Sequence, residues 1–224
     1  MIKLKKLIIV GLGETAELAY HYFMNDSEYE VVAFAADKEY VESDSFLNLP
    51  VYDISELHNI FEVDNFYVFV AVSSSKLNRV RKDLYLRVKR MGYQFASYIS
   101  SEAYVGYGTK IGENCLIMEH NVVQPFVTIG DDVVLWSGNH IGHRTIVHDH
   151  CFISSHVVIS GFCEIGAHCF LGVNTSVADN VKIGEDCLVG IGCVIAKDVA
   201  PNSIMKMPYA QKQIITAKQF YGIE

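Results

Sequence analysis

The sequence predicts a two-part protein, an N-terminal α/β domain followed by an all-β parallel β-helix, and three observations support this fold class. From Val105 to Ile195 every sixth residue is Val, Ile or Leu without a break. A fixed six-residue period is typical of a β-helix, whereas an α-helix or a plain strand has a shorter one. Before this repeat, an apolar run at Lys5–Val10 leads into a Gly-Leu-Gly turn. The cysteines, finally, follow the register of the repeat.

All six cysteines lie four residues after one of the periodic aliphatic residues: Cys115, Cys151, Cys163, Cys169, Cys187 and Cys193. They therefore share one structural position, where a β-helix needs a small apolar side chain. We expect buried, reduced packing residues at these positions and no disulfide framework. The sequence has no Cys-x-x-Cys pair, which argues against a zinc or redox centre.

Composition limits the classes of function. The chain has 224 residues, half of them hydrophobic, and a net charge of −8, which argues against nucleic-acid binding as its main task. No apolar stretch is long enough to span a membrane, so no membrane partner is expected. The lysines before Leu7 precede a run that is too short for a signal peptide. These features predict a cytoplasmic enzyme.

The region 1–98 is predicted to be a small Rossmann-like α/β domain with a parallel sheet. The β-helix is expected over 99–200, and a tail over 201–224 is expected to cap its last coil. Pro50 and the polar run Glu42–Ser45 mark a surface connection. The expected elements are strands at Lys5–Val10, Tyr29–Ala36, Phe66–Val72 and Gln94–Ile99, and helices at Thr15–Met24 and Lys76–Arg90.

A nucleotide-binding unit is predicted at the start of the α/β domain. A strand, a Gly-x-Gly-x-x-Ala turn at Gly11 and Gly13, a helix and a second strand ending at Asp37 follow one another. The glycines let the backbone approach a phosphate, and the acid can bind a ribose or a base. Ser73 and Ser74 leave the end of a third strand, where they would bind substrate or cap the next helix. The alternative is a βαβ turn that binds no ligand. Binding of a whole NAD molecule is not expected, because no second mononucleotide-binding half fits in this domain.

The repeat resembles that of the hexapeptide-repeat acyltransferases. From Leu7 to about Val199 the chain resembles the bacterial sugar acetyltransferases of the sialic acid O-acetyltransferase-like group, which includes enzymes that N-acetylate nucleotide-linked amino sugars. The resemblance implies a left-handed β-helix with three hexads per coil. It also implies a homotrimer that binds acetyl-CoA between subunits, and a nucleotide sugar whose nucleotide binds to the first domain.

The function expected from this resemblance is acetyl-CoA-dependent N-acetylation of a nucleotide-linked amino sugar, a 4-amino-4,6-dideoxy sugar by preference, in bacterial surface-glycan biosynthesis. A sugar O-acetyltransferase of the sialic acid type and a non-catalytic scaffold are the alternatives. A zinc enzyme of the γ-carbonic anhydrase type would need a third histidine beside His143 and His148. Tyr107 stands two coils before His143, so we expect no metal.

Acetyl transfer needs a general base, and histidine suits this role near neutral pH. The resemblance assigns the base to His143, with His140 as the rival and an ordinary exposed histidine as the alternative reading. Gly161 lies 18 residues later, which is one coil, or about 4.8 Å along the axis. In the family a glycine at this position offers its backbone N–H to the thioester carbonyl, so the resemblance implies that Gly161 is an oxyanion donor.

Two positions depart from the family pattern. Arg144 replaces the acidic residue that often follows the base, and Phe152 replaces a second histidine. A backbone carbonyl or a residue such as Asp149 could orient the base instead. The resemblance also implies that residues of the later coils contact acetyl-CoA. The alternative is that the glycines among them only allow the coil to turn and that the lysine is an ordinary exposed side chain. The residues concerned are Gly161, Gly172, Asn174, Gly190, Gly192 and Lys197.

Overall fold

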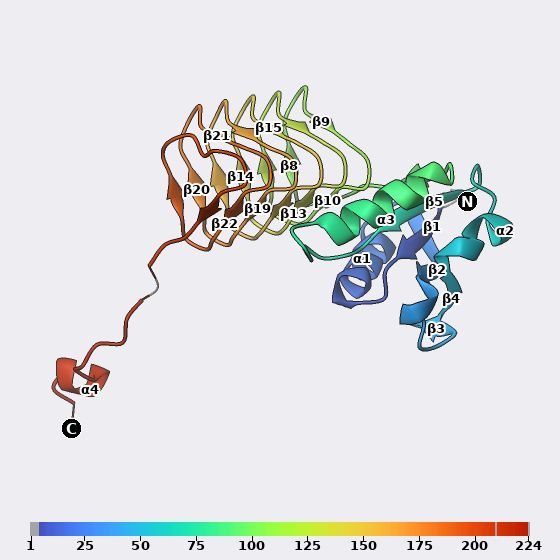
Figure 1. Cartoon of the computed structure of the whole chain (residues 1–224), viewed down its shortest axis with the longest axis horizontal. Helices are drawn as coiled ribbons and strands as arrows, with labels where there is room; N and C mark the ends of the chain where they lie inside the picture. The colour runs from blue at the N-terminus through green and yellow to red at the C-terminus, as the bar shows by residue number, and fades with distance from the viewer. Residues whose placement is uncertain (1–4, 209, 224) are drawn as a thin grey trace.

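The computed structural model describes residues 5–208 and 210–223. An α/β domain lies beside one end of a β-helix, and the C-terminal segment leads away from the far end (Figure 1). Among the described residues, no helix is both long and apolar enough to cross a membrane.

The sheet of the α/β domain has the order β3-β4-β2-β1-β5-β6, and all its pairings are parallel except β3 with β4. Residues Leu7–Val10 of its central strand are fully buried because layers cover both faces. The strands are β1 (Lys5–Val10), β2 (Tyr29–Ala36), β3 (Ser45–Phe46), β4 (Leu49–Asp53), β5 (Phe66–Val70) and β6 (Gln94–Phe95). The helices are α1 (Glu14–Asn25), η1 (Lys38–Tyr40), η2 (Ile54–Glu56), α2 (Leu57–Ile60) and α3 (Arg79–Arg90).

Three expectations for this domain differ from the structure. The segment around Pro50 is not only a surface connection, because β4 pairs with β2 inside the sheet. The basic helix begins at Arg79 and not at Lys76, since residues 76–78 all have left-handed φ values. The strand expected at Gln94–Ile99 is two strands. Its first part, β6, joins the α/β sheet, and its second part, β7, joins the β-helix.

The β-helix consists of three parallel sheets in which strands pair with the strand 18 residues later, as Ile117 does with Leu135. The first sheet contains β7 (Tyr98–Ile99), β10 (Leu116–Ile117), β13 (Val134–Leu135), β16 (Phe152–Ile153), β19 (Phe170–Leu171), β22 (Leu188–Val189) and β24 (Ile204–Met205). The second contains β8 (Tyr104–Val105), β11 (Val122–Val123), β14 (His140–Ile141), β17 (Val158–Ile159), β20 (Ser176–Val177) and β23 (Val194–Ile195). The third contains β9 (Lys110–Ile111), β12 (Thr128–Ile129), β15 (Ile146–Val147), β18 (Glu164–Ile165) and β21 (Lys182–Ile183).

From β9 to β23 the second residue of each strand is the periodic aliphatic, and together these residues form the core of the β-helix. The cysteines complete this core, and all six are buried and free, as predicted. Burial raises the pKa of the Cys115 thiol to about 12, so this thiol stays protonated at neutral pH. The repeat therefore builds a core in which each coil stacks on its neighbours.

The coil turns at three corners, which we call the first, second and third corner after the sheet that precedes each one. Non-glycine residues at the third position after an aliphatic adopt left-handed φ angles, for example 59° at Arg144 and 57° at Phe162. Asparagine, aspartate and histidine are common there because their short polar side chains tolerate this conformation. The corners place backbone and side chains at the rims of the flat sheets.

The α/β domain docks on the first sheet and the third corner of the β-helix. Arg81 of α3 is only 1% exposed, and it donates to Asp132 at 2.9 Å and to the carbonyl oxygens of His150 and Cys151. The N–H of Val70 donates to the side chain of Asn114 at 2.7 Å. These contacts fix the orientation of the first domain because breaking them would leave buried polar groups unpaired.

The C-terminal tail adds little to the β-helix. Strand β24 pairs with β22, and Met205 packs against the core of the last coil. Beyond Met205 the described residues are exposed, including the short helix α4 (Ala217–Phe220). Figure 1 places α4 away from the coils, so the expected cap is limited to β24.

Candidate functional site

A cavity of about 1100 Å³ lies at the carboxyl ends of the α/β strands, between the α1 turn and α3. Gly11, Gly13 and Asp37, which the sequence analysis named as candidate substrate-binding residues, line this cavity. Ser75 lines it as well, whereas Ser73 and Ser74 are not among its lining residues. The serines do not cap α3 either, because the N-cap of that helix is Asn78.

Gly11 is required by its surroundings. Its φ is 134°, and a Cβ at this position would lie 2.5 Å from the carbonyl oxygen of Ala71. Gly13 has no such neighbour and serves as the N-cap of α1, where it leaves the first backbone N–H groups without a side-chain partner. The turn therefore brings free N–H donors to the cavity wall.

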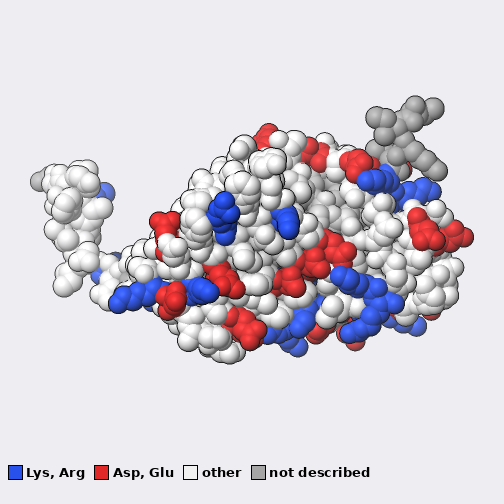
Figure 2. Space-filling model, turned by 90° about the horizontal axis from the view of Figure 1, so that it is seen from above, with Lys and Arg blue, Asp and Glu red and all other residues white. Residues whose placement is uncertain are grey.

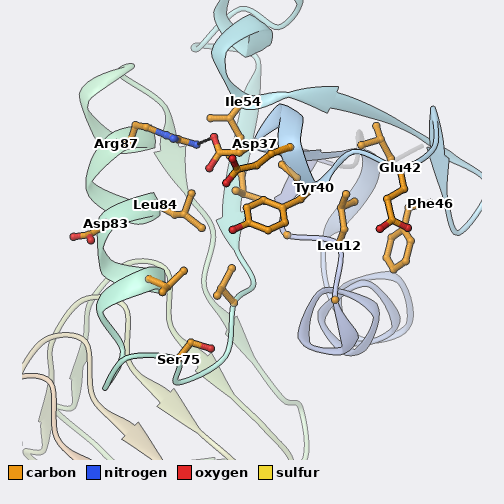
Figure 3. A pocket seen from close by; sticks show the side chains of 18 of the residues that line it. Leu12, Asp37, Tyr40, Glu42, Phe46, Ile54, Ser75, Asp83, Leu84 and Arg87 are labelled. Carbon is orange, nitrogen blue, oxygen red and sulfur yellow. Dashed lines mark hydrogen bonds and ion pairs between the residues drawn. The ribbon is translucent and has the colours of Figure 1, made fainter.

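Asp37, which follows β2, and Arg87 of α3 form an ion pair in the cavity lining, as the dashed line in Figure 3 shows. The guanidinium Nη2 donates to Asp37 Oδ1 at 2.5 Å, and both side chains are more than a third exposed. The Nε of Arg87 is buried without a hydrogen-bond partner. Tyr40, which Figure 3 also shows near Asp37, adds an aromatic surface. Sequence reasoning missed Arg87 and Tyr40 because only the fold brings them to this cavity.

Charged side chains cluster on the molecular surface along both domains (Figure 2). The lining of the cavity carries both signs: Glu39, Glu42 and Asp83 are acidic, and Arg87 and Arg90 are basic. The arginines come from the last turns of α3. They are the side chains in this wall that suit a diphosphate.

The second candidate site is at the second corner, where His143 and Gly161 lie one coil apart, following β14 and β17. His143 is exposed, and a Cβ built on Gly161 would lie 2.6 Å from its Cε1. The ring of Phe162 meets that of His143 edge to face at 4.9 Å. Glycine at 161 therefore lets the imidazole lie directly against the backbone of the next coil.

Gln124 from the preceding coil contacts His143 in two places. Its Oε1 accepts the backbone N–H of His143 at 2.8 Å and lies 3.1 Å from Nδ1 of the ring. The repeat could have pointed to this residue, because the same position in the other coils holds Gly106, Gly142, Ser160, Ala178 or Ala196. A long polar side chain at a position that is otherwise occupied by small residues is the sequence feature that could have identified Gln124.

Asp149, considered for orienting the base, and the two residues that depart from the family pattern, Arg144 and Phe152, all have other partners. Asp149 accepts the backbone N–H of Asp131 at 2.8 Å at the third corner. Arg144 places its guanidinium 4.7 Å from the ring centre of Phe126. Phe152 stacks on Phe170 in the first sheet, beneath the α/β domain.

The backbone N–H of Gly161 already has a hydrogen-bond partner. It donates to Asp179 Oδ1 at 2.9 Å, and Asp179 is exposed one coil further on. Gly161 can therefore serve an oxyanion only after Asp179 releases this N–H. His140, the rival base, lies on β14, three residues before His143 and half-buried on the outer face of the second sheet.

The residues expected to bind acetyl-CoA lie at two different corners. Lys197 and Gly161 are at the second corner. Gly172, Asn174, Gly190 and Gly192 follow β19 and β22 at the first corner. The second sheet separates these corners, so it lies between the two groups of residues within one subunit.

The structure also separates the two histidines considered for zinc. His148 contacts Glu164 of the third sheet at 3.1 Å, while His143 contacts Gln124 at the second corner. Within residues 5–208 and 210–223, no group of three or more His, Cys, Asp or Glu side chains is arranged to hold a metal ion.

Comparisons with known proteins agree with this architecture. Residues 108–143, 126–161 and 162–198 match the bacterial transferase hexapeptide family of six repeats. No curated protein sequence matches the chain significantly.

Several solved structures are similar over nearly the whole chain. The acetyltransferase domain of PglB from Neisseria gonorrhoeae has a TM-score of 0.79 and 23% identity, covering 89% of this chain and 95% of that one. PerB from Caulobacter crescentus, in complex with CoA and GDP-perosamine, has a TM-score of 0.79 and 22% identity, covering 90% and 94%. WeeI from Acinetobacter baumannii has a TM-score of 0.73 and 18% identity, covering 88% and 94%.

The expected fold class is confirmed: an N-terminal Rossmann-like domain is joined to a left-handed parallel β-helix. The repeats at residues 108–198 are those of the bacterial transferase hexapeptide family model, which covers most of the β-helix.

Proposed function

We propose that this protein is an acetyl-CoA-dependent N-acetyltransferase acting on a nucleotide-linked amino sugar, with a 4-amino-4,6-dideoxy sugar as the expected acceptor. The observation that carries the proposal is the contact between the His143 imidazole and the backbone at Gly161 on a transferase-type β-helix. Two solved structures of similar fold support the class, because they are those of perosamine N-acetyltransferase and PerB with CoA and GDP-perosamine.

The α/β cavity is proposed to hold the nucleotide. Its volume of about 1100 Å³ is enough for a nucleoside diphosphate. Asp37 would bind the ribose or the base, and the N–H groups after Gly13 would bind phosphate. Arg87 and Arg90 would balance the phosphate charge from the opposite wall. Ser73 and Ser74 remain candidates for substrate contacts near the same strand end.

His143 is proposed to act as the general base. The acceptor amine attacks the thioester carbonyl of acetyl-CoA and forms a C–N bond, while His143 Nε2 takes the proton that the amine loses. The carbonyl oxygen becomes an oxyanion, which the Gly161 N–H would stabilise once Asp179 releases it. Collapse of the intermediate breaks the C–S bond, and the CoA sulfur takes the proton from the His143 imidazolium, which leaves CoA as the thiol and His143 neutral again. Base and oxyanion donor one coil apart suit this reaction.

A homotrimer is proposed because most of the outward side chains of the second sheet are apolar and the described residues leave them exposed. Tyr104, Val122, Val158 and Val194 project from it with exposures of 58%, 37%, 44% and 70%. The corresponding face of the third sheet carries Lys110, Glu164 and Lys182. Packing of the second sheet against other copies would bury these apolar side chains.

Such an assembly would also complete the donor site. The second corner of one subunit would come near the first corner of the next, bringing His143 toward the neighbour's copies of Gly190 and Gly192. Acetyl-CoA would then lie between subunits, along Gly172, Asn174 and Lys197. The buried free thiols and the CoA donor fit a reducing compartment, so we place the reaction in the cytoplasm.

The test is a panel of purified acceptors with acetyl-CoA and the trimeric protein. Nucleotide-linked amino sugars should release CoA and gain one acetyl group on nitrogen, as measured by thiol release and mass spectrometry. Acetylation of a hydroxyl group in the same panel would identify an O-acetyltransferase. Tight binding of both ligands without turnover would support a scaffold and overturn the proposed activity.

A further inference from the structure

The side chain of Gln124 is the feature that separates this second corner from a plain hexapeptide turn. It follows the aliphatic Val123, at a position where the other coils have Gly, Ser or Ala. It is half-buried and reaches across one coil to His143. No packing requirement of the repeat calls for a long polar side chain here.

The two contacts of Gln124 determine which amide atom faces the histidine. A backbone N–H can only donate, so the atom 2.8 Å from the His143 nitrogen must be the carboxamide oxygen. The same oxygen lies 3.1 Å from Nδ1. An oxygen acceptor at this distance is favourable only if Nδ1 carries a proton. The neutral imidazole then has its lone pair on Nε2.

Other neighbours limit the movement of the ring. Gly161 lies so close that a Cβ there would be 3.0 Å from both ring nitrogens, and Phe162 contacts the ring edge to face at 4.9 Å. Arg144, which replaces the acid often found after the base, packs on Phe126. Gln124 is therefore the polar side chain that the described contacts place on Nδ1.

We propose that Gln124 is the positioning residue of the base: it holds the Nδ1–H tautomer of His143 and so presents Nε2 to the acceptor amine. This inference rests on the proposed acetyltransferase function. In the reaction Nε2 gains the amine proton, and Gln124 keeps its bond to Nδ1–H in both protonation states. A neutral amide stabilises the resulting imidazolium less than a carboxylate would.

The experiment compares Gln124→Met, Gln124→Glu and the wild-type protein. Methionine keeps the length of the side chain but removes the oxygen acceptor, so kcat should fall about tenfold to a hundredfold, within the range of general-base effects. The KM for acetyl-CoA should change less than twofold. Glutamate should restore much of kcat and shift the acidic limb of the kcat/KM profile to higher pH, because its charge favours the imidazolium.

Imidazole nitrogen NMR of the trimer gives a readout that does not depend on turnover. We expect His143 to be protonated at Nδ1 in the wild-type protein and to lose this preference in Gln124→Met. Asp149→Ala is the matched control, because Asp149 also accepts a backbone N–H from the neighbouring coil, but at the third corner. It should keep the wild-type tautomer and pH profile.

The proposed reaction and the positioning role of Gln124 can be refuted separately. If no acceptor is acetylated while NMR shows Nδ1–H held by Gln124, the proposed reaction is wrong and the positioning contact stands. If acetylation occurs but Gln124→Met keeps both kcat and the pH profile, Gln124 has no positioning role. A wild-type His143 protonated at Nε2 would overturn the inference as well.

Discussion

His143 and Gly161 are in direct contact although 18 residues separate them, because one turn of the β-helix brings the imidazole against the glycine backbone. A Cβ at position 161 would lie 2.6 Å from Cε1 and 3.0 Å from both ring nitrogens of His143. Real Cβ atoms do not approach so closely, so the ring keeps its place only while residue 161 is glycine.

The first prediction is that Gly161→Ala displaces the imidazole and lowers kcat by about a hundredfold, since a misplaced base loses most of its effect. Thermal unfolding should change little because the side chain that must give way, His143, is exposed. Steady-state kinetics and a melting curve test this. Ser160→Ala, the neighbouring change to a smaller side chain, is the control. Equal losses in both variants would contradict the steric explanation.

The second prediction concerns the identity of the base. His143→Ala should lower kcat by about 10² to 10⁴ while the affinity for acetyl-CoA stays close to wild type. His140→Ala should have a much smaller effect, because His140 lies on the flat face of β14 and not beside Gly161. Pre-steady-state acetyl transfer and CoA binding by calorimetry separate the two roles. A larger loss of kcat in His140→Ala than in His143→Ala would indicate that the active site lies on the outer face of the second sheet.

The third prediction concerns the nucleotide. Asp37→Ala should raise the KM for the nucleotide sugar about tenfold or more, because a hydrogen-bonded carboxylate is lost and Arg87 loses its partner. The KM for acetyl-CoA should stay within twofold. Glu28→Ala is the control, since it removes the exposed ion pair with Lys5 in the same domain. Equal increases in both KM values would show that Asp37 affects the stability of the fold and does not bind the nucleotide.

The fourth prediction concerns assembly and can be tested by mixing two inactive variants. His143→Ala removes the base at the second corner. Gly192→Asp adds a negative charge at the first corner, where φ is 67° and open space surrounds the position. If the site combines these corners from two subunits of a trimer, random co-assembly should restore about a quarter of the wild-type sites.

Light scattering and activity on the co-expressed mixture measure this result. A site contained within one subunit would give no recovery, because every subunit would carry a defect. A monomer at micromolar concentration would exclude the shared site altogether.

The fifth prediction concerns pH and the junction between the domains. Burial, together with the positive charges of Arg79 and Lys82, lowers the pKa of His168 to about 4. The unfolded chain therefore binds a proton at this residue between about pH 6.5 and 4, while the folded protein does not. The folded state should lose stability as the pH falls through that window.

His168→Phe should remove this contribution and keep the stacking on His150, whose ring lies 5.1 Å away. Denaturant unfolding at a series of pH values from 7 to 4 measures the slope. His120→Phe, the same substitution at an exposed corner, is the control. An unchanged slope in His168→Phe would contradict the prediction.

The sequence determined the β-helix on its own. A period of six with one obligatory aliphatic residue leaves only one way to bury that residue in every coil, and the same count placed six cysteines in the core. The sequence also predicted the βαβ unit at the start of the first domain, because the alternation of strand, turn and helix follows from local periodicity. The structure then shows that Gly11, Gly13 and Asp37 of this unit line one cavity.

The tertiary structure decided the contacts between residues that the period alone does not relate. Gln124 belongs to the coil before His143, and Arg87 reaches Asp37 from a helix 50 residues away. Such pairs depend on the exact stacking of coils and on the docking angle of α3, which Arg81 fixes through buried bonds to the third corner. A pattern of burial tells which side chains point inward, because burial follows the local period. Which polar side chains meet at the surface depends on the relative positions of whole elements, and these are set only when the chain is folded.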